Sequence, residues 1–225
     1  MSKKISFLRA LSSVSIGKKQ IMGLTGLALC GFLVTHLLGN FLVLLGPDAF
    51  NNYAHTLISN PFIYVAEAGL VALFLSHLFM ALKLTWENRQ ARPVKYYMKK
   101  STGRGETFAS KTMIYTGIIT FIFVVLHLIS FKYGTEYTTY IDGVKVRDIY
   151  KLVIEYFSNP LYVAWYVVAM ISMGIHTSHG FWSAFQSLGF NHEKYTPIIR
   201  KISCLYACFI GLGFSFLSIW CHFQN

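Results

Sequence analysis

Five apolar segments, each long enough to cross a hydrocarbon layer of about 30 Å, constrain the fold of this chain more than any other feature. Their approximate bounds are 20–45, 61–88, 111–131, 160–187 and 196–223. A backbone inside a lipid layer must satisfy its own hydrogen bonds, and a helix does so within one segment. Charged residues make up 13% of the chain, about half of the share in a soluble domain. The sequence predicts an all-α integral membrane protein with a single membrane domain over residues 1–225 and five transmembrane helices in a bundle.

The distribution of basic residues predicts how the helices are oriented. The loops on one side are rich in Lys and Arg, namely Lys3, Lys4, Arg9, Lys18, Lys19, Arg89, Arg92, Lys95, Lys99, Lys100, Arg104, Lys111, Lys194, Arg200 and Lys201. On the other side, 46–60 has no Lys or Arg, and 132–159 balances its bases with acids. Basic loops remain in the cytoplasm, so we expect a cytoplasmic N-terminus and a multi-pass protein of the cell inner (cytoplasmic) membrane. The basic side also suits docking of a partner, whereas no motif supports nucleic-acid binding.

Four of the five segments contain a histidine at a similar distance from the segment start: His36, His77, His127 and His176. Consecutive helices run in opposite directions, so His36 and His127 are expected to share an outer level. His77 and His176 are expected to share a level nearer the cytoplasm, roughly 10 Å away along the membrane normal, given the helical rise. The sequence therefore predicts two histidine pairs.

Two histidines at one depth in a helix bundle are suited to be the axial ligands of a haem iron. A structural zinc site takes four protein ligands, and neither level offers a third or fourth. A proton relay would favour carboxylates at staggered depths, and a single membrane histidine can be a hydrogen-bonded packing residue. For two matched pairs, we favour two haem b groups. With both axial positions filled, such haems transfer electrons through the bilayer.

A short internal repeat accompanies the outer histidines. The segments TGLALCGFLVTH and TGIITFIFVVLH each place His ten residues after Thr-Gly. Gly26 and Gly117 should therefore lie about 15 Å along the helix from the outer ligands, near the inner level. Glycine there would let a porphyrin lie against the backbone; close helix–helix packing explains either glycine equally well.

The motifs VTHLLGN, FNNYAHTL, PFIYVAEAG, LSHLFMA, VLHLISF and GIHTSHGFWSAFQSLG resemble a known family over nearly the whole chain. It is the five-helix, dihaem cytochrome b membrane subunit (cytochrome b558 family) of succinate:quinone oxidoreductases, which include succinate dehydrogenase and fumarate reductase. The resemblance implies one haem on His77 and His176 and another on His36 and His127. The family usually has Asn where this chain has His179, which favours His176 as the ligand.

The same resemblance implies partners and a substrate. A flavoprotein subunit with covalent FAD carries the dicarboxylate chemistry, and an iron–sulfur subunit passes electrons to the membrane. Both would dock on the cytoplasmic face. The membrane substrate would be a quinone, more often menaquinone in dihaem members.

Glu67 and His55 are the candidates for handling the protons of the quinone. Glu67 is an acidic residue within the second apolar segment, and a carboxylate in a membrane is a functional candidate. His55 lies in FNNYAHTL, which matches a family motif near the outer haem. Alternatively, Glu67 bonds a polar group of a neighbouring helix and His55 caps a loop. Some fumarate-reducing relatives have a carboxylate two positions before the fourth-helix ligand, where this chain has Gly174; a proton route of that kind is therefore in doubt.

Two other functions remain open from the residues alone. The chain could be the cytochrome b subunit of a formate dehydrogenase or hydrogenase, or a haem-free membrane transporter with histidines in a proton path. Outside the five segments, Val146 to Phe157 has helical spacing of apolar residues and is expected to lie on the membrane surface or over the outer haem.

Overall fold

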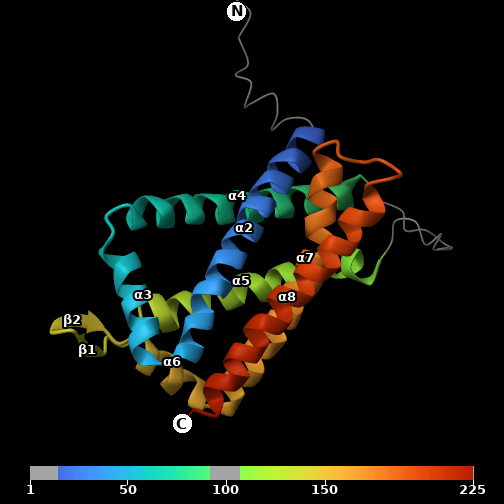
Figure 1. Cartoon of the computed structure of the whole chain (residues 1–225). Coiled ribbons are helices and arrows are strands. Elements are labelled where there is room, and N and C mark those ends of the chain that lie inside the picture. Colours follow the sequence, from blue (N-terminus) through green and yellow to red (C-terminus); the bar gives the residue numbers. More distant parts are fainter. Residues whose placement is uncertain (1–14, 92–106, 225) are drawn as a thin grey trace, which may run out of the picture.

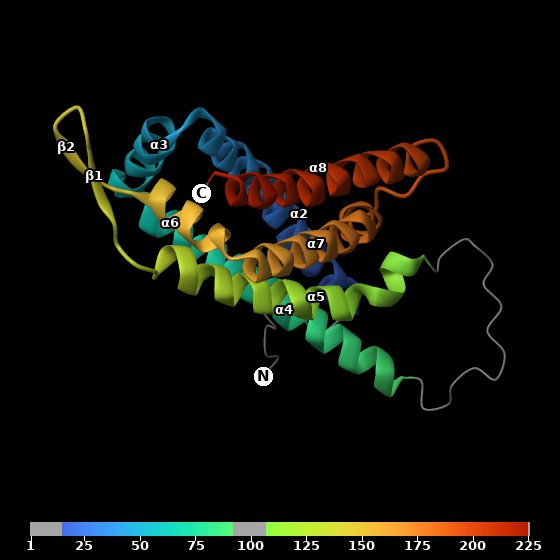
Figure 2. The same ribbon diagram turned by 90° about the horizontal axis from the view of Figure 1, so that it is seen from below.

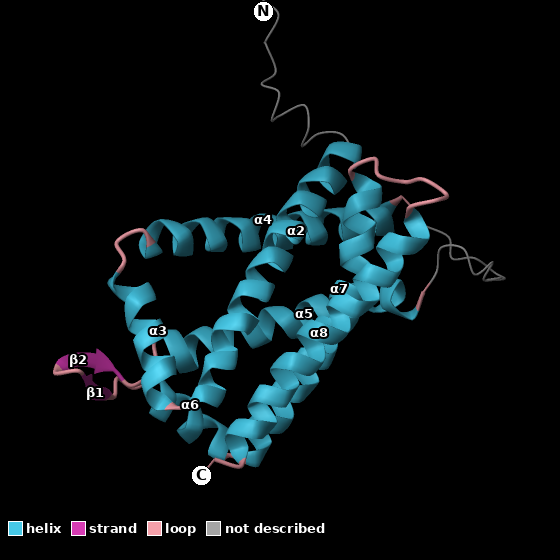
Figure 3. Cartoon of the chain, viewed as in Figure 1, coloured by secondary structure: helices cyan, strands magenta, loops and turns pink. Residues whose placement is uncertain are grey.

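The computed structural model describes residues 15–91 and 107–224, which are almost entirely helical (Figures 1 and 3). Five long helices dominate this part of the chain, two of them prolonged by a short 3₁₀ or π-helical turn, and two shorter helices and a β-hairpin join them. The elements are α2 (Ser15–Asn40), η1 (Phe41–Leu45, 3₁₀), α3 (Pro47–Ser59), α4 (Ile63–Gln90), α5 (Phe108–His127), η2 (Leu128–Lys132, π), β1 (Thr138–Ile141), β2 (Val144–Arg147), α6 (Ile149–Ser158), α7 (Pro160–Ser187) and α8 (Thr196–His222).

The five helices that are long and apolar enough to cross a membrane coincide with the five predicted segments, which confirms the all-α membrane class. Their ends differ from the predicted ones by a few residues because capping residues, rather than hydropathy, determine where a helix begins and ends. Thr107 starts α5 earlier than expected through a capping box. Its hydroxyl accepts from the Ser110 amide at 3.1 Å, and the Ser110 hydroxyl accepts from the Thr107 amide at 3.0 Å. At α7, the Asn159 side chain accepts from the Leu161 amide at 2.9 Å.

Helices α3 and α6 and the hairpin lie together at one end of the molecule, which we call the ribbon end (Figure 1). The opposite end, which we call the basic end, holds Lys18, Arg89 and Arg200. The predicted surface helix from Val146 is wrong at its start, because Val146 pairs with Thr139 in the hairpin and α6 begins only at Ile149. Helix α3 was not predicted.

A buried amide joins the two short helices of the ribbon end. The Asn51 side chain of α3, 1% exposed, donates to the Asp148 carboxylate at 2.8 Å and accepts from the Tyr150 amide at 2.9 Å. Asp148 also accepts from the Lys151 amide at 3.0 Å and so caps α6. These hydrogen bonds hold α3 and α6 together, so the two connections at this end form one structured unit.

Helices α7 and α8 make the most extensive contact of the bundle, α2 and α5 both pack on α7, and α4 packs mainly on α2 (Figure 2). Because lipid provides no hydrophobic force between helices, small residues and polar contacts join them. The buried Ser203 hydroxyl of α8 donates to the Ser178 carbonyl of α7 at 2.7 Å. The Tyr206 hydroxyl of α8 donates to the Cys30 carbonyl of α2 at 2.9 Å.

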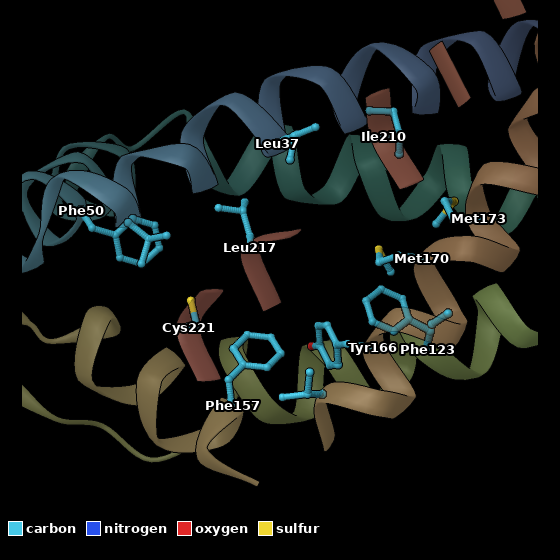
Figure 4. Packing of buried hydrophobic residues seen from close by; sticks show 13 residues of the cluster. Leu37, Phe50, Phe123, Phe157, Tyr166, Met170, Met173, Ile210, Leu217 and Cys221 are labelled. Carbon is cyan, nitrogen blue, oxygen red and sulfur yellow. The ribbon is translucent and has the colours of Figure 1, made fainter. Parts of the chain in front are cut away.

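Most of the large buried apolar side chains lie in the half of the bundle toward the ribbon end (Figure 4). They come from α2, α3, α5, α6, α7 and α8 and include Leu37, Phe50, Phe123, Phe157, Tyr166, Met170, Met173, Ile210, Leu217 and Cys221. At the basic end, the buried Lys18 of α2 donates to the Glu87 carboxylate of α4 at 2.5 Å. This ion pair fixes the antiparallel contact between the two helices.

The predicted orientation places the basic end in the cytoplasm. Of the basic residues behind that prediction, Lys18, Lys19, Arg89, Lys111, Lys194, Arg200 and Lys201 fall on or beside the basic-end tips of the long helices. The others lie in 1–14 and 92–106, outside the described residues. The cytoplasmic N-terminus stays a prediction.

Candidate site of paired histidines

The structure brings the four membrane histidines together in two pairs. The ring centres of His36 and His127 are 5.9 Å apart with planes at 89°, and those of His77 and His176 are 6.4 Å apart with planes at 71°. These are the pairs that depth counting predicts. One pair joins α2 to α5, and the other joins α4 to α7, so each links helices from the two sides of the bundle.

The inner histidine of α4 hydrogen-bonds to a backbone carbonyl and a side-chain hydroxyl of α2. The Nδ1 atom of His77 lies 3.1 Å from the Met22 carbonyl and 3.3 Å from the Thr25 hydroxyl. Thr25 directs its own hydrogen to the Ile21 carbonyl at 2.8 Å or the Met22 carbonyl at 3.1 Å. Both neighbours of Nδ1 therefore accept a hydrogen bond, so Nδ1 carries the hydrogen and Nε2 carries the lone pair.

The inner histidine of α7 is held in the same way by α5. The Nδ1 atom of His176 lies 3.2 Å from the Thr116 hydroxyl. Thr116 directs its hydrogen to the carbonyl of Thr112 at 3.1 Å or Met113 at 3.2 Å, which leaves its oxygen as an acceptor. His176 is therefore also protonated on Nδ1, with the Nε2 lone pair available to a metal ion.

The two glycines of the internal repeat lie against these imidazoles. A Cβ atom on Gly26 would come within 3.1 Å of His77 Cε1, and one on Gly117 within 3.4 Å of His176 Cε1. The glycines thus reach the inner level, as the spacing predicts, and their bare backbone gives the rings room. The expected contact between these glycines and a porphyrin stays a prediction.

The outer pair has a more aromatic setting. His127 Nδ1 lies 3.0 Å from the Tyr166 hydroxyl of α7, and the ring is flanked by Phe123 and Phe131 at 5.5 and 5.3 Å between centres. His36 stacks on Phe32 at 5.1 Å. The only polar neighbour of His36 Nδ1 in the described chain is the Asn40 amide nitrogen at 3.5 Å, a weak contact.

This donor set fits a haem better than a metal ion held by protein alone. No group of three or more His, Cys, Asp or Glu side chains gathers at one point within residues 15–91 and 107–224. Each pair therefore offers two nitrogens, the number that a bis-histidine haem takes from its protein. If each nitrogen lies about 2 Å from a shared ion, the ring centres are roughly 6 Å apart, close to both observed separations.

The two residues expected to handle quinone protons are not brought together. Glu67 of α4 forms an ion pair with Lys132 at the end of η2, and both side chains are about 40% exposed. His55 hydrogen-bonds Ser59 at 3.4 Å within α3. In the described residues no hydrogen bond links Glu67 to His55. Lys132 follows His127 by five residues, so the ion pair lies on the continuation of the helix that carries an outer histidine.

His179, which the sequence distinguishes from the ligand position, belongs to a separate cluster toward the basic end. Its ring centre lies 5.2 Å from that of Trp182, and the Arg200 guanidinium lies 4.4 Å from the Trp182 ring. Its buried Nδ1 has no hydrogen-bond partner within the described residues. Within the described residues no hydrogen bond links this cluster to the inner pair, and His77 makes its ring contact with His176. The choice of His176 rather than His179 as the ligand stays a prediction.

Three polar residues of the site were not predicted: Thr25, Thr116 and Tyr166. The two threonines could have been found, because each immediately precedes a glycine of the repeat and has a methionine three residues before it. Tyr166 has no such signal. Only the packing of α7 on α5 shows that its hydroxyl reaches His127.

The chain is similar to a succinate dehydrogenase subunit. Over 189 residues it is 26% identical to the succinate dehydrogenase cytochrome b558 subunit of Bacillus subtilis (strain 168), with 84% of this chain and 85% of the relative covered. No protein-family model matches the chain, and no solved structure matches it. The similarity covers most of both proteins, so it bears on the chain as a whole rather than on single residues.

Proposed function

We propose that this protein is the membrane-anchor and electron-transfer subunit of a succinate:quinone oxidoreductase, a succinate dehydrogenase or fumarate reductase of the cytoplasmic membrane. In this function it passes electrons between an iron–sulfur subunit and a membrane quinone by means of two bis-histidine b haems. The observation that carries the proposal is the pairing of four histidines on apolar helices, two of them with Nδ1 bound to acceptors. Similarity to a cytochrome b558 subunit supports it.

In this function, His77 and His176 hold the inner haem, and His36 and His127 hold the outer one. When bound, haem supplies reversible one-electron transfer. The protein supplies orientation: Thr25 and Thr116 accept the Nδ1 hydrogens of the inner histidines at 3.3 and 3.2 Å. Around the outer pair, the rings of Phe32, Phe123 and Phe131 pack on the imidazoles, and these apolar neighbours would keep the local dielectric constant low.

The partner subunits would dock at the basic end. We infer a flavoprotein with FAD and an iron–sulfur protein there, because the relative is named as a succinate dehydrogenase subunit. In the described chain this end is formed by the tips of α2, α4, α5, α7 and α8. Its lysines and arginines would attract an acidic partner surface and speed association.

A visible spectrum of the purified protein tests the proposal directly. We expect two b haems per chain in a reduced-minus-oxidised spectrum, quantified after extraction of the haem. We also expect the chain to co-purify from its membranes with a subunit that oxidises succinate. Correctly folded protein without haem would refute the electron-transfer function. Co-purification with a formate- or hydrogen-oxidising subunit would assign the chain to a different complex.

The role of Glu67 in quinone chemistry is tested by E67Q. If the carboxylate delivers or takes up quinone protons, we expect quinone-coupled turnover to fall by about a hundredfold, a common effect of losing a general acid or base. Both haems should remain, and succinate oxidation with a water-soluble electron acceptor should be unchanged. The matched control is K132Q, which removes the ion pair but keeps the carboxylate. Equal losses in both variants would show that Glu67 acts only as the partner of Lys132.

A further inference from the structure

The internal repeat includes a methionine in addition to the Thr-Gly pair. Met22, Thr25 and Gly26 on α2 correspond to Met113, Thr116 and Gly117 on α5, with His36 and His127 each ten residues after the glycine. Each Met-x-x-Thr-Gly stretch therefore precedes an outer histidine on its own helix.

The two stretches also make the same contacts. Each receives the inner histidine of the next long helix, His77 from α4 or His176 from α7, with Nδ1 facing the threonine hydroxyl at 3.3 or 3.2 Å. The methionine carbonyl lies beside it: Met22 directly at 3.1 Å from His77 Nδ1, and Met113 as a backbone hydrogen-bond partner of His176. The glycine faces the Cε1 edge of the ring in both cases. We call each stretch a histidine seat.

We propose that the two histidine seats are positioning elements that fix the tautomer and rotation of both inner ligands, with Thr25 and Thr116 as the positioning residues of the inner haem. The proposal rests on the haem-binding function proposed above. It assigns one half of the inner site to α2 and the other half to α5, neither of which contributes an inner ligand.

The hydroxyl oxygen has a definite electronic effect. The hydroxyl groups of Thr25 and Thr116 donate their hydrogens to backbone carbonyls. Each hydroxyl oxygen therefore accepts a hydrogen bond from the imidazole Nδ1–H. A hydrogen bond of this kind makes the ligand more basic and orients it. A more basic ligand favours the oxidised metal ion, so removing the acceptor should raise the midpoint potential of the inner haem and weaken its binding.

The experiment uses the complete complex in its own membranes. Thr25→Val and Thr116→Val replace the hydroxyl by a methyl group of similar size. We expect the inner haem to titrate at a higher potential in each and to show roughly ten- to hundredfold weaker retention, while the outer haem is unchanged. Thr25→Ser and Thr116→Ser, which keep the hydroxyl, should restore the wild-type potential.

The matched control is Thr120→Val, one turn further along α5. The buried Thr120 hydroxyl has no hydrogen-bond partner within the described chain, so this variant removes a hydroxyl without touching a histidine. If Thr25→Val and Thr116→Val titrate like Thr120→Val, the proposal is overturned. Because the seats are equivalent, either valine variant decides the question if the other does not assemble.

Alanine substitutions at the two glycines provide a second test, because the two positions differ in the space available for a Cβ atom. An alanine Cβ at Gly26 would be only 3.1 Å from His77 Cε1, which forces the ring to move, whereas 3.4 Å at Gly117 is an ordinary contact. We therefore expect Gly26→Ala to alter the low-temperature absorption band of the inner haem and Gly117→Ala to leave it nearly unchanged. Equal spectra in both variants would contradict the seat geometry.

The two proposals fail in different ways. Wild-type protein without haem would remove the electron-transfer function and, with it, the seats. Wild-type protein with two haems, whose inner potential is insensitive to both threonines, would remove only the seats.

Discussion

Alanine at His77 or His176 is expected to remove the inner haem from the protein and leave the outer haem in place. Each imidazole supplies one of two axial ligands, and no other His, Cys, Asp or Glu gathers with the pair in the described chain to replace it. Among residues 15–91 and 107–224, the contact at 6.4 Å between ring centres is the histidine–histidine ring contact at that level. The measurement is haem per chain, with the two haems distinguished by redox titration. We expect a fall from two haems to one in each variant.

The control for this prediction is His179→Ala, three residues after His176 on the same helix. His179 packs on Trp182 and should leave both haems bound. The converse experiment uses His36→Ala or His127→Ala, which should remove the outer haem alone. Full haem content in any of these four ligand variants would exclude that histidine as an axial ligand.

Gly174→Glu is expected to prevent assembly rather than to add a proton route. Some fumarate-reducing members of the family that the sequence resembles have a carboxylate at this position. Here a Cβ atom on Gly174 would lie 3.2 Å from the Ala207 carbonyl and 3.6 Å from Gly211 Cα, both on the backbone of α8. Overpacking of this kind costs about 1–3 kcal/mol, and an unpaired carboxylate buried between helices adds several kcal/mol more.

The amount of folded protein in membranes and its thermal stability measure this effect. Gly174→Gln has the same bulk without the charge and should be less damaging than the glutamate. Gly69→Ala is the control for adding a methyl group, since a Cβ there has no neighbour within 4 Å; Gly174→Ala should be the less stable of these two alanine variants. A fully assembled Gly174→Glu protein with wild-type stability would show that α7 and α8 are not as close as the structure has them.

The spans and the histidine pairing could be read from the sequence because they depend on one-dimensional quantities. Segment length sets which helices cross a membrane, and residue count along antiparallel helices sets depth. Neither requires knowledge of how a helix is rotated about its axis. Residue counting therefore matches His36 with His127, and His77 with His176, without any information on contacts.

The hydrogen-bond partners of the histidines depend on the rotation and tilt of each helix, which residue counting does not give. Tyr166 reaches His127 only because α7 turns that face toward α5. Likewise, the ion pair of Glu67 with Lys132 requires a residue beyond the expected end of the third segment at 131. The continuation of α5 into η2 carries Lys132 to that point. Helix α3 was missed because its mixed polarity gave no long apolar run.

The attachment of α4 has a consequence for how the protein matures in the cell. This helix has one buried residue, Leu84, and packs mainly on α2; its bridge to α7 is the contact between His77 and His176. Ligation of one iron by both side chains would tie α4 to the remainder of the molecule. On the haem-binding function proposed above, chains made during a shortage of iron or porphyrin would lack this link to α7 and would hold α4 mainly by its contacts with α2. Such chains should be degraded faster by membrane proteases, so that cofactor supply influences the lifetime of the newly made subunit.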